Sequence, residues 1–98
     1  MFVYEVVATV KAERAAEWHA WIIPHMQEVV DTGCFVTSEL EKIIDPPSTD
    51  VNFRVRYHSP SMQLIERYLS EHAPALRAAG IERFGEDVST RRTIAEQL

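Results

Sequence analysis

Strict alternation of apolar and polar side chains over residues 51–58 is the feature that most constrains the fold of this chain. One side of an extended backbone would carry only apolar side chains: Val51, Phe53, Val55 and Tyr57. The other side would carry only polar ones: Asn52, Arg54, Arg56 and His58. A period of two is typical of a β-strand with one buried face. Residues 51–58 are therefore predicted to be a strand in a sheet that is covered on one side.

Two earlier segments alternate in a similar way. Residues 2–10 are predicted to form the first strand and residues 34–44 the second. The run 45–50, with two prolines, is turn-forming by composition. Strands joined by a short turn pair as an antiparallel hairpin, so residues 34–44 and 51–58 are expected to be neighbours. A last strand is predicted over about residues 87–94.

Two segments carry helical periodicity instead. In residues 13–31, apolar side chains and one histidine recur at spacings of three and four, on one face of a helix: Trp18, Trp21, Ile22, His25, Met26 and Val29. Pro24 lies inside this pattern and is predicted to kink the helix or divide it, because proline has no N–H. The second helix is predicted to open at residues 59–61, to end or bend at Pro74, and to continue over residues 75–84.

The resulting order, β-α-β-β-α-β, predicts an α+β fold of the ferredoxin-like type, with a four-stranded antiparallel sheet and helices on one face. At this length, residues 1–98 are expected to form a single domain. The sheet face under the helices is expected to carry the more apolar set: Tyr4, Val6, Val36, Leu40, Phe53, Val55 and Tyr57. The opposite face is expected to carry the polar set: Glu5, Thr9, Glu39, Glu41, Asn52, Arg54, Arg56, His58 and Arg91.

The polar face has two interpretations. In the first, opposite charges on neighbouring strands pair in solvent, and each pair stabilises the sheet by ~0.2–1 kcal/mol. In the second, two such faces meet in a homodimer and enclose a polar cavity. Apolar residues on the same face favour partial burial, because they would otherwise be exposed together: Val3, Val7, Phe35 and Ile43.

Composition excludes several classes of protein. The chain is 46% hydrophobic and 26% charged, which is an ordinary globular balance. Its net charge is −5 and its longest basic run is Arg91-Arg92, so neither nucleic acid nor an anionic membrane is an expected partner. No apolar stretch approaches the ~20 residues of a membrane span. A single cysteine, Cys34, cannot form an internal disulfide, and a cytoplasmic location is expected.

His25 is the candidate catalytic residue, because it lies on the apolar stripe with Trp21. It is either a core histidine bonded to a backbone carbonyl or to Glu28, or a general base or polar anchor in a pocket with a pKa shifted by burial. Arg54 and Arg56 either clamp a carboxylate or pair with the glutamates of neighbouring strands.

No metal site and no cofactor are predicted. His19 and His25 lie ~120° apart on a helix and do not converge. Cys34 is interpreted as a small buried hydrophobe. Tyr68 and His72 are expected to form a pair on a helix surface. The sequence contains no glycine-rich phosphate loop and no G-x-S-x-G motif.

Several motifs along the chain resemble a bacterial family of short proteins classed as a domain of unknown function. They are Trp18-x-x-Trp21, His25, Glu28-Val29, Thr32-Gly33-x-Phe35, Tyr57-x-x-Pro60-Ser61, Tyr68, Ala73-Pro74-x-Leu76-Arg77, Phe84-Gly85 and Arg92-Thr93. The family pattern tends to read His-x-Pro-Glu in the first helix, whereas here Pro24 precedes His25. The resemblance implies a fold similar to the dimeric α/β-barrel proteins, a group that includes cofactor-free monooxygenases, isomerases and haem enzymes.

Three functional hypotheses follow. The first is a homodimeric protein that binds a small polar or aromatic ligand without chemistry of its own, with a binding set of Trp21, His25, Arg54, Arg56 and His58. The second is a cofactor-independent monooxygenase- or isomerase-like enzyme of the dimeric-barrel type. There, His25 would be base or orienter, Arg54 or Arg56 would position an anionic oxygen, and Trp21 would stack on the substrate. The third is a protein-interaction module that uses an edge strand or the tail, residues 95–98.

Overall fold

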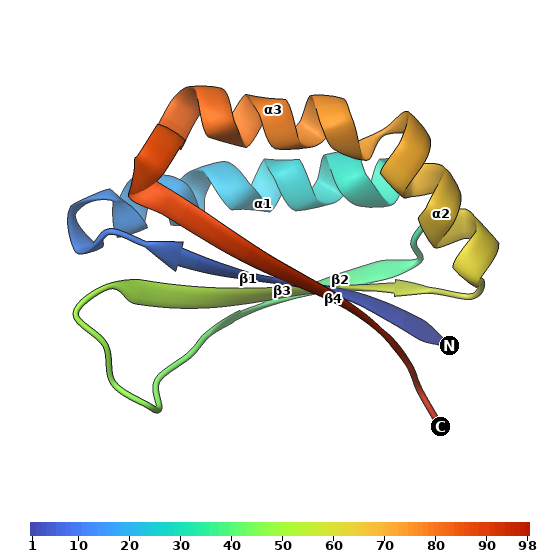
Figure 1. The fold of residues 1–98 in the computed structure, drawn as a ribbon, viewed down its shortest axis with the longest axis horizontal. Helices are drawn as coiled ribbons and strands as arrows, with labels where there is room; N and C mark the ends of the chain where they lie inside the picture. The colour runs from blue at the N-terminus through green and yellow to red at the C-terminus, as the bar shows by residue number, and fades with distance from the viewer.

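The computed structural model describes residues 1–98 and has the predicted element order (Figure 1). The strands are β1 (Phe2–Val10), β2 (Thr37–Lys42), β3 (Val51–Ser59) and β4 (Val88–Glu96). The α-helices are α1 (Ala15–Asp31), α2 (Met62–Glu71) and α3 (Ala73–Phe84), and short 3₁₀ turns cover Ala12–Arg14 and Gly85–Asp87. The strands form one antiparallel sheet in the order β2-β3-β1-β4. The predicted ferredoxin-like fold is confirmed.

The three helices lie on one side of the sheet (Figure 1). The buried positions of β1 and β3 alternate, as their sequences predict, and Tyr4 pairs in register with Tyr57 and Val6 with Val55. The α1 stripe packs onto this face, and its buried residues are Trp18, Ile22, Met26 and Val29. The core therefore lies between the helices and the sheet and leaves the opposite face open. None of the helices combines the length and apolar character needed to span a membrane.

Pro24 does not divide α1, which runs unbroken from Ala15 to Asp31. The residue is exposed, and so is Ala20, whose carbonyl would accept the missing hydrogen bond. Water can hydrogen-bond that carbonyl on the outer side of the helix, while the apolar stripe keeps its contacts on the inner side. Burial of one continuous stripe outweighs the loss of one helical hydrogen bond.

β2 is shorter than predicted and begins only at Thr37. Cys34 and Phe35 precede the strand and are both buried in the core, whereas Val36 is 53% exposed. The assignment of Val36 to the core face and of Phe35 to the open face was therefore wrong. The cause is the connection after Gly33, where the Ser59 hydroxyl donates to the Cys34 carbonyl at 2.8 Å and draws the chain inward before it becomes extended.

The last strand ends later in the sequence than predicted. β4 extends to Glu96, which pairs in register with Phe2, and the Gln97 N–H donates to the Met1 carbonyl at 2.8 Å. Ala95 and Glu96, which the prediction placed in the tail of residues 95–98, therefore belong to the strand. β4 and β2 are the two edge strands of the sheet.

Candidate ligand-binding site

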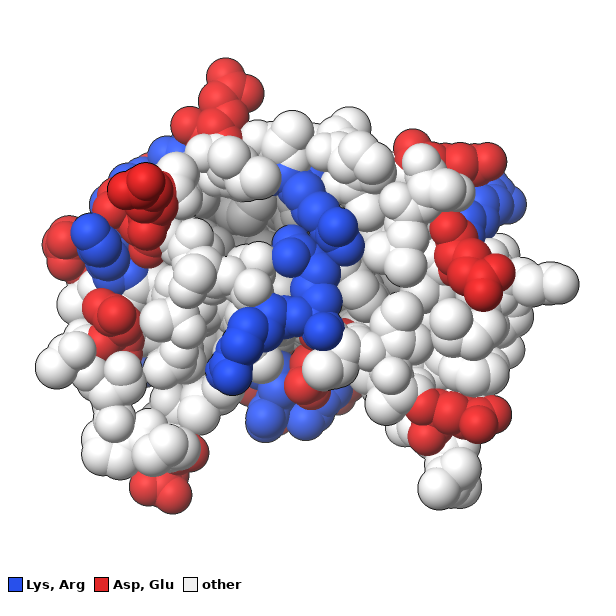
Figure 2. Space-filling model, viewed as in Figure 1, with Lys and Arg blue, Asp and Glu red and all other residues white.

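A cavity of about 190 Å³ lies between the sheet and the helices. The sheet contributes Tyr4, Val6, Val55 and Tyr57, and α1 contributes Trp18, Trp21, Ile22 and His25. Further lining comes from Tyr68 of α2, from α3, and from β4 through Val88, Thr90 and Arg92. Figure 2 shows a hollow on the face where α3 and β4 lie in front, with basic side chains gathered beside it. No aspartate or glutamate lines the cavity.

Trp21 forms the aromatic wall of the cavity together with its neighbours. Its indole stacks on His25 with ring centroids 4.4 Å apart and meets Phe84 edge-on at 5.5 Å. Gly80 of α3 faces the indole closely, since a Cβ there would lie 3.1 Å from Cη2 of Trp21. A glycine in the middle of a helix costs stability, by about 0.5–1 kcal/mol relative to alanine. Here it makes the room that the Trp21 ring occupies.

His25 is half-buried in this wall, and its imidazole stacks on Trp21. Burial lowers the pKa of His25, because the charged form loses hydration, and the negative charge of Glu28 opposes this effect only partly. No hydrogen bond to Glu28 or to a backbone carbonyl forms, so the predicted core bonding is replaced by aromatic stacking. The ring is therefore a neutral imidazole beside the cavity at neutral pH.

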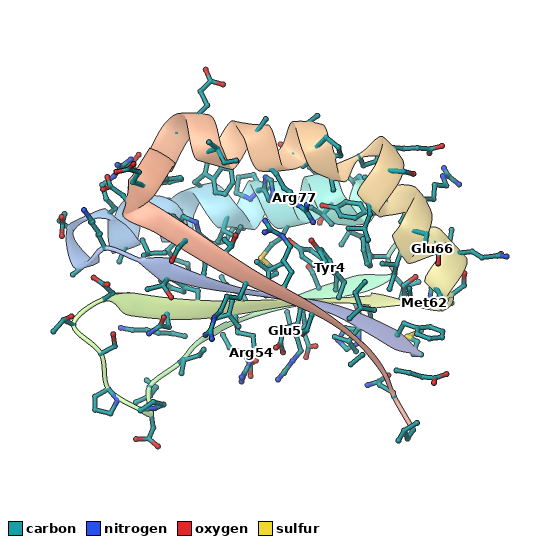
Figure 3. The ribbon with its side chains drawn as sticks, in the orientation of Figure 1. Tyr4, Glu5, Arg54, Met62, Glu66 and Arg77 are labelled. Carbon is teal, nitrogen blue, oxygen red and sulfur yellow. The ribbon has the colours of Figure 1, made fainter.

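Tyrosine hydroxyls and one arginine form a polar part of the lining. Arg77 reaches from α3 toward the sheet, where its Nη2 donates to the Tyr4 hydroxyl at 2.9 Å (Figure 3). Tyr68, predicted to pair with His72 on a surface, is buried instead, with its ring 5.7 Å from that of Tyr4 and stacked on His72 at 6.4 Å. Burial raises the pKa of Tyr68 to about 12 and also raises that of Tyr57. Both phenols therefore stay neutral at physiological pH.

Arg77 and Arg92 have no acidic partner. Arg92 donates only to the Thr90 hydroxyl, at 2.9 Å. The Nε of Arg77 is buried and has no hydrogen-bond acceptor. Arg91, on the open face, has no acidic partner either, and the remaining five arginines form ion pairs with carboxylates: Arg14, Arg54, Arg56, Arg67 and Arg83.

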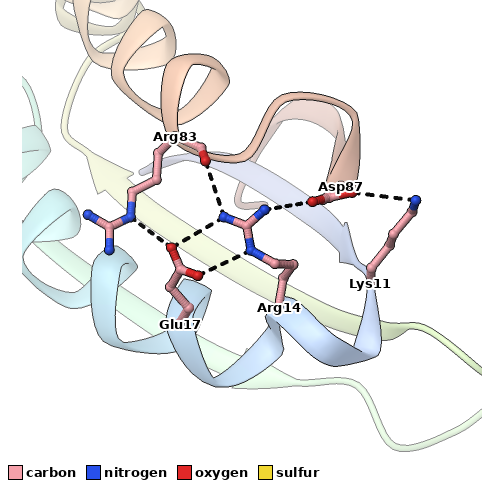
Figure 4. Close-up of polar contacts among 5 residues, drawn as sticks. All are labelled: Lys11, Arg14, Glu17, Arg83 and Asp87. Carbon is pink, nitrogen blue, oxygen red and sulfur yellow. Dashed lines mark hydrogen bonds and ion pairs between the residues drawn. The ribbon is translucent and has the colours of Figure 1, made fainter.

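Phe84 and Gly85 belong to the cavity lining, and an ion-pair network connects the segments on either side of them (Figure 4). Arg14 donates to Asp87 at 2.6 Å and to Glu17 at 3.1 Å, and Arg83 donates to Glu17 at 3.1 Å. The Arg14 guanidinium also lies 4.8 Å from the centre of the Phe84 ring. The network joins the beginning of α1 to the end of α3, and these hydrogen bonds lower the pKa values of Glu17 and Asp87.

The other predicted binding residues lie on the opposite side of the sheet. Glu5 and Arg54 point away from the helices (Figure 3). Arg54 donates to Glu41 at 2.9 Å, and Arg56 donates to Glu5 and to Glu41, each at 3.0 Å. His58 contacts Glu39. The interpretation of Arg54 and Arg56 as ion-paired residues is confirmed, and these pairs lower the pKa of Glu41.

The structure thus brings the predicted residues together as two separate groups. Trp21 and His25 share the cavity, whereas Arg54, Arg56 and His58 share the open face. An oxygen held by Arg54 or Arg56 would be separated from His25 by the sheet. No group of three or more histidine, cysteine, aspartate or glutamate side chains converges as metal ligands would.

The sequence reasoning did not assign Arg77 and Arg92 to the site. A signal for Arg92 existed, since it alternates with Val88, Thr90 and Ile94 and shares their side of β4. Arg77 gave a weaker signal, because α3 is only weakly amphipathic and its sequence does not single out one face.

Solved structures with the same fold support the topology. A protein assigned as an antibiotic biosynthesis monooxygenase from Deinococcus radiodurans superposes with a TM-score of 0.77 and 13% identity, over 100% of this chain and 93% of that one. SnoaB, a cofactor-independent oxygenase from Streptomyces nogalater, gives 0.70 and 11%, over 98% and 92%. A dimeric ferredoxin-like protein from an uncultured marine organism gives 0.72 and 7%, over 99% and 97%. At these identities the similarity shows the fold, which is that of the dimeric α/β-barrel proteins.

At the level of sequence, the chain is similar to a protein family and not to a curated protein. No curated protein matches this sequence. Residues 1–98 match the family described as a domain of unknown function (DUF4286). The motifs that pointed to such a family run through the whole chain, as the match does. The chain belongs to this family.

Proposed function

We propose that this protein binds a small aromatic molecule in the cavity between its helices and its sheet. The observation that carries this proposal is the wall formed by Trp21, His25 and Phe84, in a cavity of about 190 Å³. An apolar cavity of about 150 Å³ is large enough to take benzene. Ligand pockets in proteins are mainly apolar and aromatic, with a few polar groups that set orientation.

A melting-temperature screen with small neutral aromatic compounds, such as indole and benzamide, tests this proposal. A ligand that binds only the folded chain raises the melting temperature in proportion to its saturation. Gly80→Val should abolish the rise, because the added methyl groups push the Trp21 ring into the cavity. Ala79→Val is the matched control, since Ala79 is exposed on the same helix. Equal shifts in the two variants would place binding outside the cavity and overturn the proposal.

A second candidate function is proton abstraction from the bound molecule, as in a cofactor-independent monooxygenase- or isomerase-like enzyme. The observation that favours it is His25, whose lowered pKa keeps an unprotonated imidazole beside the cavity, ready to accept a proton. The test is exchange of a ligand C–H for deuterium in heavy water, followed by NMR. His25→Gln should abolish protein-dependent exchange without abolishing binding. If the unaltered protein and the His25→Gln variant exchange the ligand hydrogen at the same rate, His25 is excluded as the base.

We further propose that the protein is a homodimer whose two open sheet faces meet. The open face carries Val3 and Val7 among its charged residues, and both are only half-buried within one chain. The charges on this face pair within the chain, as between Arg56 and Glu5, so covering it leaves few isolated charges. A structural neighbour is described as a dimeric ferredoxin-like protein.

A further inference from the structure

Four polar side chains from different elements line the same cavity: Tyr4 of β1, Tyr68 of α2, Arg77 of α3 and Arg92 of β4. Arg77 donates to the Tyr4 hydroxyl at 2.9 Å, and the rings of Tyr4 and Tyr68 are 5.7 Å apart. Arg77 and Arg92 both line the cavity with Tyr68, and the charge of each arginine opposes the rise in the Tyr68 pKa that burial causes. Two cationic groups from different elements therefore converge on one region of the lining, which we name the Arg77–Arg92 cluster.

This convergence of cations is unusual for such an acidic chain. The chain has fifteen acidic residues and ten basic ones, yet none of the acidic residues lines the cavity. Arg77 is half-buried, and a charge held partly out of water destabilises the fold unless something neutralises it. Arg77 Nε is already buried without an acceptor, which leaves a strong donor unsatisfied. The cluster lacks a negatively charged group, and nothing within the chain supplies one.

A guanidinium group is a planar fork whose donors match the two oxygens of a carboxylate. The Tyr68 hydroxyl is neutral at physiological pH and can add a donor without adding negative charge. Beside the cluster, Trp21 and His25 offer flat apolar surfaces to a ring. The same small cavity thus presents donors for an anion and a wall for an aromatic group.

We propose that the ligand is a small aromatic carboxylate, whose carboxylate accepts hydrogen bonds from Arg77 and Arg92 while its ring lies against Trp21. This inference rests on the proposed binding function and adds the chemical class of the ligand. It also assigns Arg77 and Arg92 as the residues that select the anion.

The test compares benzoate with benzamide at neutral pH, by calorimetry or by NMR titration. The two compounds have nearly the same shape and differ in charge. Benzoate should bind about tenfold or more tightly than benzamide, as expected for hydrogen bonds to a charged partner. Arg92→Gln and Arg77→Gln should each reduce this preference to near unity. Arg92→Lys should keep part of it, because the charge remains while the fork is lost.

Arg91→Gln is the matched control, since Arg91 is adjacent in sequence but lies on the open face of the sheet, opposite Val7. It removes the same charge and should leave the preference for benzoate unchanged. A thermal melt of each variant shows whether it is folded, and Arg92→Gln changes an exposed side chain, so the test does not depend on Arg77→Gln remaining stable.

The possible outcomes distinguish failure of the proposed ligand class from failure of the proposed binding function. If benzamide and indole bind as tightly as benzoate, the cavity is a neutral aromatic site and the inference is wrong. If Arg91→Gln lowers the preference for benzoate as much as Arg92→Gln does, the preference reflects the overall charge of the protein and not a contact with Arg92. The inference is then also wrong. If none of the three compounds binds, the proposed function fails, and the ligand class fails with it.

Discussion

The Ser59 hydroxyl is a fully buried polar group, and its contacts explain why the chain after α1 turns into the core. It donates to the Cys34 carbonyl at 2.8 Å, although the two residues are 25 positions apart in the sequence. Cys34 and Phe35 are held inside by this connection, and Phe35 then stacks on Tyr4 with centroids 5.9 Å apart. One hydroxyl thus helps to position a side chain that packs against the cavity lining.

Ser59→Ala should lower the free energy of unfolding by about 1–3 kcal/mol, because the buried Cys34 carbonyl loses its hydrogen-bond donor. Urea denaturation followed by circular dichroism measures this change. Ser70→Ala is the control, since Ser70 is exposed and its hydroxyl bonds within α2 to the Arg67 carbonyl. If Ser70→Ala lowered the free energy of unfolding as much as Ser59→Ala, the role given to the buried Ser59 hydroxyl would be wrong.

His25 should make the stability depend on pH. Its folded-state pKa lies below the 6.5 of an unfolded histidine, so the unfolded chain binds the proton more tightly. The contribution of His25 is complete above pH 6.5 and is lost as the pH falls through its folded-state pKa. His25→Gln should therefore reduce the fall in unfolding free energy as the pH drops below 6.5. A titration by NMR that places the pKa of His25 above 6.5 would contradict this prediction; His19→Gln, at an exposed position of α1, is the control.

At the scale of elements, α1 shows how packing overrides a local signal. Proline inside a helix removes one hydrogen bond and is expected to interrupt the helix. The buried stripe of α1 lies on both sides of Pro24, with Ile22 before it and Met26 after it. Because these side chains pack into one core, an interruption would expose one of them.

Pro24→Ala should raise the free energy of unfolding by about 1–3 kcal/mol, since it restores a helical N–H donor at an exposed position. The gain is reduced by the greater freedom of the unfolded chain. Pro74→Ala is the matched control, because Pro74 lies in the first turn of α3, where no N–H partner is needed. Chemical denaturation measures the free energy of unfolding of both variants. A larger gain from Pro74→Ala than from Pro24→Ala would contradict this prediction.

At the scale of the whole molecule, the sheet separates two environments. One face is covered by helices and carries the cavity, and the other carries ion pairs and half-buried valines. The binding proposal concerns the first face and the dimer proposal the second, so the two can be tested independently.

A homodimer should give a solution mass of twice the 11.2 kDa of the chain, measured by light scattering during gel filtration. Thr93→Arg should shift this mass toward the monomer. Thr93 lies on the open face opposite Glu5, which can pair with the new arginine within one chain while the added bulk obstructs a second copy. Gln63→Arg, at an exposed position of α2, should leave the mass unchanged. A monomer in the unaltered protein would contradict the dimer.

Periodicity was sufficient to predict the strands, the helices and their order, because period and turn composition are local properties that each segment carries. It also placed Trp21 and His25 on one stripe and Arg54 on the open face. The beginning of β2 could not be predicted, because it depends on a hydrogen bond from Ser59 to Cys34, which is distant in sequence.

The cavity and the Arg77–Arg92 cluster depend on distant segments in the same way. Tyr4, Tyr68, Arg77 and Arg92 come from four elements, and no pattern within any one of them indicates the others. Pairing of β4 with β1 brings Arg92 beside Val6, and α3 brings Arg77 to Tyr4. Local order follows from neighbours along the chain, whereas a binding site requires side chains that meet only when the helices pack onto the sheet.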